Sequence, residues 1–175
     1  MLKAKFAMNI RLNLPLLAIA GAVAIGAPAY TQGPSVIDAP GETIIAKLHA
    51  EGAQIYECKR DAGGMLAWQF REPIATLLLD GVTVGRHYAG PSWDHSDGSG
   101  ITAKAVADAP GKTARDIPWL KLEVTAHHGN GALSKVTTVQ RINTQAGVIK
   151  DSCAKAGAYA TTPYSADYIF LQKGM

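Results

Sequence analysis

The chain has 175 residues, with 17 lysine and arginine residues against 14 aspartate and glutamate residues. Three of the basic residues and none of the acidic ones precede residue 30, so the rest of the chain carries 14 residues of each charge. This balance argues against a nucleic-acid or anionic-membrane surface, which needs a basic patch. The length predicts one domain with a substantial core.

The N-terminus has the pattern of a secretory signal peptide. Met1–Arg11 carries only basic charges, Leu16–Ala27 is apolar, and Ala27-Pro28-Ala29 supplies the small residues of a cleavage site. A membrane span needs about 20 apolar residues, whereas this run has 12. We therefore expect cleavage near Ala29, a secreted or periplasmic product, and no membrane span in the mature chain.

Beyond the signal peptide (1–29), residues 30–40 predict an extended arm and residues 41–175 a single all-β domain. No stretch of the mature chain keeps a helical period over three turns. The predicted strands lie at 44–49, 54–58, 66–70, 75–79, 82–84, 101–106, 120–126, 136–143 and 164–171. Short strands separated by Gly, Pro and Asn turns predict an antiparallel sandwich or barrel with long loops.

Several local features refine this prediction. Asp80-Gly81 is a hairpin signal, residues 107–118 form the longest predicted loop, and residues 152–157 predict a short helical turn. Trp68 alternates with Leu66 and Phe70 along its strand, and this pattern predicts a core position.

Cys58 and Cys153 both follow the predicted cleavage site. An even number of cysteines in an exported protein predicts a disulfide, which here encloses 94 residues. A reactive thiol or a metal-ligand pair is the alternative. Neither cysteine has the CxxC spacing or the neighbouring histidine that this alternative needs.

Six motifs occur in order along the mature chain. They are Gly52–Cys58, Gly85–Trp93, Asp97–Ser99, Ile117–Leu120, Gln140–Thr144 and Pro163–Tyr168. In this order they resemble an uncharacterised domain-of-unknown-function family of exported bacterial and fungal proteins. The resemblance supports export and the cysteine pair, and it implies no established activity.

Some fungal members of that family carry a malate dehydrogenase label, which the residues of this chain oppose. A dinucleotide fold needs a glycine-rich turn between a strand and a helix, with an acid about 20 residues further on. The nearest candidate, Gly129–Ser134, lacks the third glycine and leads into another predicted strand. We therefore reject this activity and predict no cofactor.

Polar and aromatic side chains concentrate in Gly85–Ser99, which joins two predicted strands. Aromatic faces beside amide, guanidinium and carboxylate groups suit a polar ligand with one apolar face. The predicted ligand contacts are His87, Tyr88, Trp93, Asp97, Gln140, Arg141 and Asn143. We therefore predict non-catalytic binding of a glycan or small polar ligand; for Arg141, structural pairing with Asp167 or another acid is an equal alternative.

A metal-dependent or hydrolytic enzyme is the competing function, with His87, His95 and Asp97 as ligands or acid–base groups. Their spacing matches no recognised metal motif, and Asp94–Ser99 lacks the terminal glutamate of an EF-hand. We predict solvated turn histidines, a tight turn at Asp97-Gly98 and no metal site. An envelope protein-interaction domain that binds by an exposed strand edge is a third possibility.

Overall fold

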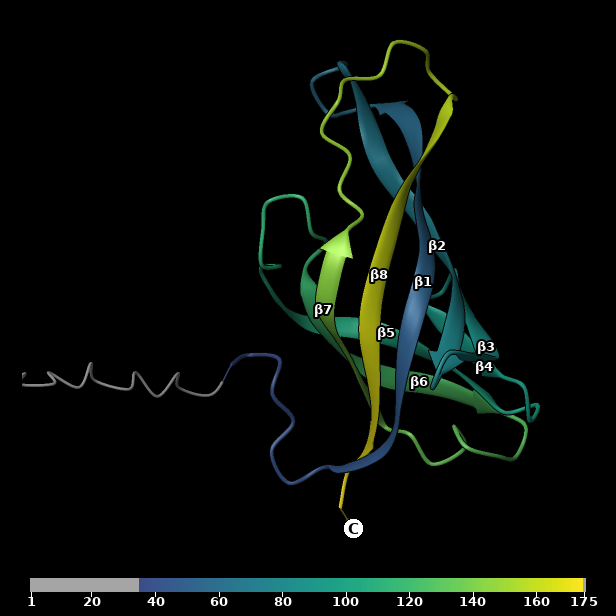
Figure 1. Cartoon of the computed structure of the whole chain (residues 1–175). Helices are drawn as coiled ribbons and strands as arrows, with labels where there is room; N and C mark the ends of the chain where they lie inside the picture. The colour runs from purple at the N-terminus through teal and green to yellow at the C-terminus, as the bar shows by residue number, and fades with distance from the viewer. Residues whose placement is uncertain (1–34, 175) are drawn as a thin grey trace, which may run out of the picture. The chain divides into compact units, whose positions relative to one another are not determined.

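The computed structural model describes residues 35–174. The predicted signal peptide and the first part of the predicted arm lie outside the described residues. Residues 35–174 form eight strands and no helices (Figure 1). These residues therefore contain no helix long and apolar enough to cross a bilayer. The strands are β1 (Thr43–Arg60), β2 (Leu66–Leu79), β3 (Val82–Tyr88), β4 (Ser92–His95), β5 (Gly100–Ala109), β6 (Trp119–His128), β7 (Thr138–Ala146) and β8 (Tyr159–Gln172).

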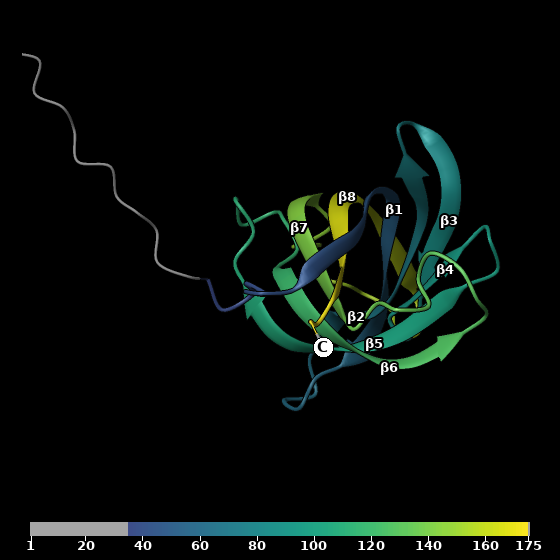
Figure 2. The ribbon, with the colours of Figure 1, turned by 90° about the horizontal axis from the view of Figure 1, so that it is seen from below.

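The strands form one closed antiparallel barrel. Each strand pairs with the next in the chain, and β8 pairs with β1, so the ring has no break (Figure 2). The all-β prediction is confirmed, and of its two alternatives the chain forms the barrel. Each short connection favours this up-and-down order; at Asp80-Gly81 both residues have positive φ (50° and 80°), as the predicted hairpin turn requires.

The core fills the barrel interior with the inward side chains of alternating strand positions. On β8 the predicted face of Ala166, Tyr168 and Phe170 is fully buried, and it packs against Leu48 and Ala50 from β1. Because the side-chain period of a strand is two, the β1–β8 register brings these residues to one face together.

Three long strands continue beyond the barrel. The paired segments 54–60 of β1, 66–73 of β2 and 159–163 of β8 have no partners from β3 or β7, and we call them the three-stranded extension. They rise above the other strands in Figure 1. The predicted disulfide between Cys58 and Cys153 is present and ties segment 147–158 to this extension, with the two Cα atoms 5.8 Å apart.

The extension also explains one wrong prediction. Trp68 and Leu66 are half-buried rather than core, and Phe70 is 54% exposed. All three lie on the extension, so their alternating face continues past the barrel interior and has fewer residues to pack against.

Three smaller predictions are also corrected. The two predicted strands 44–49 and 54–58 are one strand, because Gly52 lets β2 pass close to β1 instead of ending it. The predicted loop 107–118 begins later, since β5 continues to Ala109. Residues 152–157 form bends and a turn but no helix.

Candidate functional site

A cavity of about 540 Å³ lies where the three-stranded extension meets the barrel. Its walls come from all eight strands and from the connections between them. The lining residues are Gln54, Tyr56, Phe70, Arg71, Pro73, His87, Ala89, Gly90, Pro91, Trp93, Ala105, Ile117, Pro118, Leu120, Leu122, Arg141, Val148 and Tyr168. Most of these side chains are apolar, and none of them is a carboxylate.

Three aromatic side chains in mutual contact form the floor of the cavity. His87 on β3 lies directly opposite Trp93 on β4, so both point into the barrel. Their rings are stacked with centroids 4.5 Å apart, and the ring of Tyr168 from β8 lies 4.9 Å from His87 and 5.4 Å from Trp93. All three side chains are at most 2% exposed.

The hydrogen bonding of His87 defines its protonation. Its Nδ1 lies 2.8 Å from the carbonyl oxygen of Ser92. A carbonyl only accepts, so Nδ1 carries the proton and Nε2 carries the lone pair. Burial lowers the pKa of His87 to about 4, and the positive charge of Arg141 also lowers it. The imidazole is therefore neutral at pH 7.

Arg141 on β7 supplies a positive charge to the cavity wall. Its Nε and Nη2 donate to the carbonyl oxygen of Pro118, at 3.1 and 2.8 Å. Within residues 35–174 no carboxylate lies within 4.0 Å of this guanidinium. Burial raises the pKa of Tyr56 and of Tyr168, and the positive charge of Arg141 opposes both shifts. The guanidinium therefore influences Tyr56 at the mouth of the cavity and Tyr168 at its floor.

The mouth of the cavity is built on the extension. Tyr56 donates its hydroxyl to the carbonyl oxygen of Gly147 (2.8 Å), and its ring meets the edge of Phe70 with centroids 5.9 Å apart. Arg71 is already paired, with Glu72 at 3.1 Å and the Tyr159 hydroxyl at 2.6 Å. These contacts fix the aromatic rim and neutralise the second arginine of the lining.

Of the seven predicted ligand contacts, His87, Trp93 and Arg141 line this cavity. His87 and Trp93 form its floor. The prediction of solvated turn histidines is wrong for His87, because its register opposite Trp93 places it inside the barrel.

The other four predicted contacts do not line the cavity, and each has a partner within the protein. Tyr88 donates to Asp94 (3.0 Å) beneath Arg86, whose guanidinium lies 4.9 Å from the ring centroid. Gln140 donates to the carbonyl oxygen of Ile37 at 2.6 Å.

Asn143 and Asp167 form a separate cluster. Asn143 donates to Asp167 at 2.9 Å, and His49 also bonds this carboxylate at 2.9 Å. The structural alternative that pairs Arg141 with Asp167 or another acid is therefore wrong, because within residues 35–174 Arg141 contacts the carbonyl of Pro118 and no carboxylate.

Asp97 organises a turn. Its carboxylate accepts from the backbone N–H of Ala132 (2.7 Å) and from both the N–H and the hydroxyl of Ser99 (2.9 and 2.6 Å). These donors hold the pKa of Asp97 well below its usual range. The predicted turn at Asp97-Gly98 is present, with Gly98 at φ 86°, and Asp97 ties it to the loop at Ala132.

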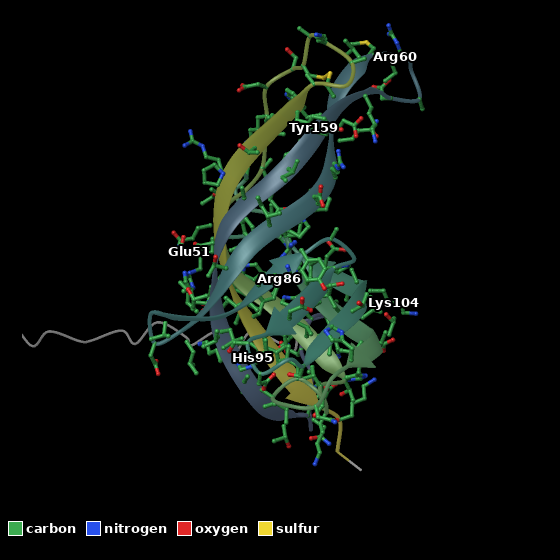
Figure 3. All side chains as sticks on the ribbon, turned by 90° about the vertical axis from the view of Figure 1, so that its right-hand side faces the viewer. Glu51, Arg60, Arg86, His95, Lys104 and Tyr159 are labelled. Atoms are coloured by element: carbon green, nitrogen blue, oxygen red, sulfur yellow. A yellow bond between two sulfur atoms is a disulfide. The ribbon has the colours of Figure 1, made fainter. Side chains whose placement is uncertain are left out.

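The histidines and aspartates of the predicted metal loop are distributed over different contacts. His95 lies 3.0 Å from Asp97, and His128 lies 3.3 Å from Asp94. Among the side chains of residues 35–174, no group of three or more His, Cys, Asp or Glu is arranged to hold a metal ion. Figure 3 shows Arg86 and His95 on the barrel, separate from Arg60 and Tyr159 on the extension.

Sequence reasoning does not identify several residues of the cavity, including Tyr56, Pro118 and Leu120. The signal that points to them is their place in the motifs Gly52–Cys58 and Ile117–Leu120. Alternation alone cannot separate such residues from ordinary core positions, because a cavity wall and a core face have the same period.

The fold and the site together define a class: a closed eight-stranded antiparallel barrel with a side-chain-lined cavity at one end. The chain belongs to the family described as Protein of unknown function (DUF3455), whose model matches residues 39–83 and 79–172. The family membership predicted from the six motifs is thereby confirmed. Neither a curated protein nor a solved structure matches the chain.

Proposed function

We propose that this protein is an exported, non-catalytic binding protein that holds one small, largely apolar ligand in its barrel cavity. The observation that carries the proposal is the cavity itself. Its volume of about 540 Å³ falls in the range of small-molecule sites, roughly 300–1,000 Å³. Such sites combine apolar walls with a few polar groups that orient the ligand, as the lining does here.

The chemistry of the lining favours an apolar ligand over the predicted glycan. A sugar needs many hydrogen-bonding partners, and three polar residues predicted for that role, Asp97, Gln140 and Asn143, bond within the protein instead. Phe70, Leu120 and their apolar neighbours dominate the walls. Binding of a glycan stays a prediction, and glycans serve below as comparison ligands.

The same lining supports a binding role over catalysis. Most enzymes that form a covalent intermediate use Ser, Thr, Cys, Lys, Asp or Glu as the nucleophile, with a base beside it. The cavity offers the neutral imidazole of His87 and the phenols of Tyr56 and Tyr168, with no Ser, Thr, Cys, Lys, Asp or Glu among its lining residues. We therefore place the protein among binding proteins.

Export is the second part of the proposal. It is supported by the signal-peptide pattern of the first 29 residues and by the Cys58–Cys153 disulfide, since disulfides persist in oxidising compartments. Intact-mass measurement of protein recovered from the cell envelope or the medium tests it. We expect a chain that begins at Tyr30 with both cysteines oxidised, and an uncleaved, reduced cytosolic chain contradicts export.

Binding is tested with N-phenyl-1-naphthylamine, a neutral apolar probe whose fluorescence rises in apolar surroundings. We expect the probe to bind the wild-type protein saturably. Envelope glycans, added as competitors, should displace it only weakly. In Ala105→Trp the added indole fills part of the cavity that Ala105 lines, so affinity for the probe falls by about tenfold or more, because ligand and side chain compete for one volume.

Lys104→Trp is the matched control. Lys104 is the neighbouring residue on β5 and lies opposite Glu123 of β6 in the strand register. It does not line the cavity, because adjacent strand residues face opposite sides. The affinity of Lys104→Trp for the probe should equal that of the wild type. Equal binding by wild type and Ala105→Trp, or no binding at all, overturns the proposed site.

A further inference from the structure

We propose that the ligand carries a single carboxylate, which Arg141 binds at the cavity wall. This inference rests on the proposed function and adds the chemical class of the ligand: an apolar monocarboxylate. Three observations support it: the lining carries two arginines, Arg71 already has an acidic partner, and Arg141 has none but lies among buried side chains.

The lining contains two arginines and no acid. Arg71 is neutralised by Glu72 at 3.1 Å. Arg141 donates through Nε and Nη2 to the neutral carbonyl oxygen of Pro118 and also interacts with the neutral phenol of Tyr168. A guanidinium has five N–H donors, so Arg141 retains donors for a ligand. The cavity therefore carries a net positive charge that nothing in its walls compensates.

The surroundings of Arg141 strengthen its attraction for an anion. Tyr168 and His87, whose titration its charge influences, are almost fully buried, and most of the remaining wall is apolar. Arg141 itself is half-buried, so on the cavity side its guanidinium gives up part of its hydration without gaining a counter-ion. A carboxylate that enters the cavity restores the missing charge and accepts the planar, charge-assisted hydrogen bonds that a guanidinium offers.

His87 does not contribute to the preference for a carboxylate, which depends on Arg141. Its Nδ1–H is committed to the carbonyl oxygen of Ser92, and the neutral ring adds no second positive charge at pH 7. A cationic ligand meets repulsion from Arg141 and finds no acid in the lining, while an alcohol gains only a neutral hydrogen bond. The expected order of affinity is carboxylate, then alcohol, then amine.

Three chain-matched probes test this order at neutral pH by calorimetric titration: octanoate, octan-1-ol and octylamine. We expect octanoate to bind at least about tenfold more tightly than octan-1-ol, which is the usual gain of a charge-assisted hydrogen bond over a neutral one. Equal affinities for all three overturn the carboxylate inference and leave the proposed function standing. Binding of none of them, together with no binding of the naphthylamine probe, overturns both.

Variants assign the selectivity to Arg141. In Arg141→Gln the octanoate preference should disappear while the affinity for octan-1-ol stays within about threefold, which shows that the cavity is intact. Arg141→Lys should recover part of the preference because it restores the charge without the planar fork. A preference that survives Arg141→Gln contradicts the assignment.

Arg115→Gln is the matched control. Arg115 is exposed, lies in the same loop as Pro118 and is outside the lining of this cavity, so the variant makes the same change in net charge. It should keep the wild-type preference for octanoate. If Arg141→Gln fails to fold, the comparison of octanoate with its neutral and cationic analogues on wild-type protein still decides the inference.

Discussion

The imidazole of His87 makes one aromatic contact and one hydrogen bond at the cavity floor. It stacks on Trp93, and through Nδ1 it bonds the carbonyl oxygen of Ser92, the first residue of the next strand. The Ser92 carbonyl favours the charged ring, but burial outweighs it, and a charged imidazolium would lose hydration and face the positive charge of Arg141. Protonation of this one residue therefore opposes folding.

This setting predicts a pH dependence of stability. In the unfolded chain His87 takes up a proton near pH 6.5, whereas in the folded protein burial lowers its pKa to about 4. Between these values the unfolded state binds more protons, so the contribution of His87 to the free energy of unfolding falls as pH falls from about 6.5 to about 4. The total loss is about 3 kcal/mol, and above pH 6.5 the contribution is constant.

Urea unfolding of the wild type and His87→Gln at several pH values between 4 and 7.5, roughly the window of this titration, measures the effect. The variant lacks the titrating group, so its stability should fall less steeply in acid. Other groups, including His49 with its pKa raised by the hydrogen bond to Asp167, are present in both proteins and cancel in the comparison. Parallel curves would contradict the buried neutral state of His87.

Single residues also show the limit of inference from sequence at this scale. His87, Trp93 and Arg141 were predictable as ligand contacts because they are chemically distinctive residues in a dense polar and aromatic pattern. Gln140 and Asn143 are equally polar neighbours, yet they bond Ile37 and Asp167 instead. Composition does not tell which side of a strand faces a cavity; register does.

At the scale of elements, the close approach of β1 and β2 at Gly52 lets β1 run without interruption from the barrel into the extension. A Cβ atom at Gly52 would contact the carbonyl oxygen of Ile74 and lie 2.6 Å from the Cα of Ala75. Both neighbours are backbone atoms of β2, which cannot move aside as a flexible side chain can. The glycine is therefore required by the packing of two strands rather than by a turn.

Gly52→Ala is accordingly expected to lower the free energy of unfolding by about 1–3 kcal/mol, the usual cost of overpacking, as measured by urea denaturation. The matched control is Gly63→Ala, where an added Cβ meets only the Asp61 side chain at 3.3 Å. This variant should unfold like the wild type. A neutral Gly52→Ala would show that β1 and β2 separate without cost.

At the scale of the whole molecule, the disulfide holds a cavity wall in place. Cys58 lies on the extension, and Cys153 belongs to segment 147–158, whose Gly147 accepts a hydrogen bond from Tyr56 at the cavity mouth. The barrel interior has its own core of packed side chains, whereas the extension consists of three strands. The disulfide therefore stabilises the part of the fold with the smaller core.

The double variant Cys58→Ala/Cys153→Ala should lose about 2–5 kcal/mol of stability, because the crosslink closes a long loop in the unfolded chain. Its affinity for the naphthylamine probe should also fall, since segment 147–158 is released from the extension. Urea unfolding and probe titration of the wild type and the variant measure the two effects. Titration of free thiols in unfolded wild-type protein should find none, and two free thiols would exclude the disulfide.

The all-β class, most strand positions, the cysteine pair and the family follow from the amino-acid sequence alone. These depend on local alternation, on turn residues such as Asp80-Gly81, and on cysteine number, all of which are properties of short segments or of counts.

Long-range strand pairing, by contrast, closes the sheet into a barrel rather than a sandwich, extends three strands beyond it and creates the cavity between the barrel and the extension. Closure depends on the pairing of β8 with β1, which are more than 100 residues apart along much of their register. The same long-range register turns His87, Trp93 and Arg141 toward one space and sends Gln140 and Asn143 elsewhere. The stretch Gly85–Ser99 thus contributes the floor of a site whose other walls come from strands throughout the chain.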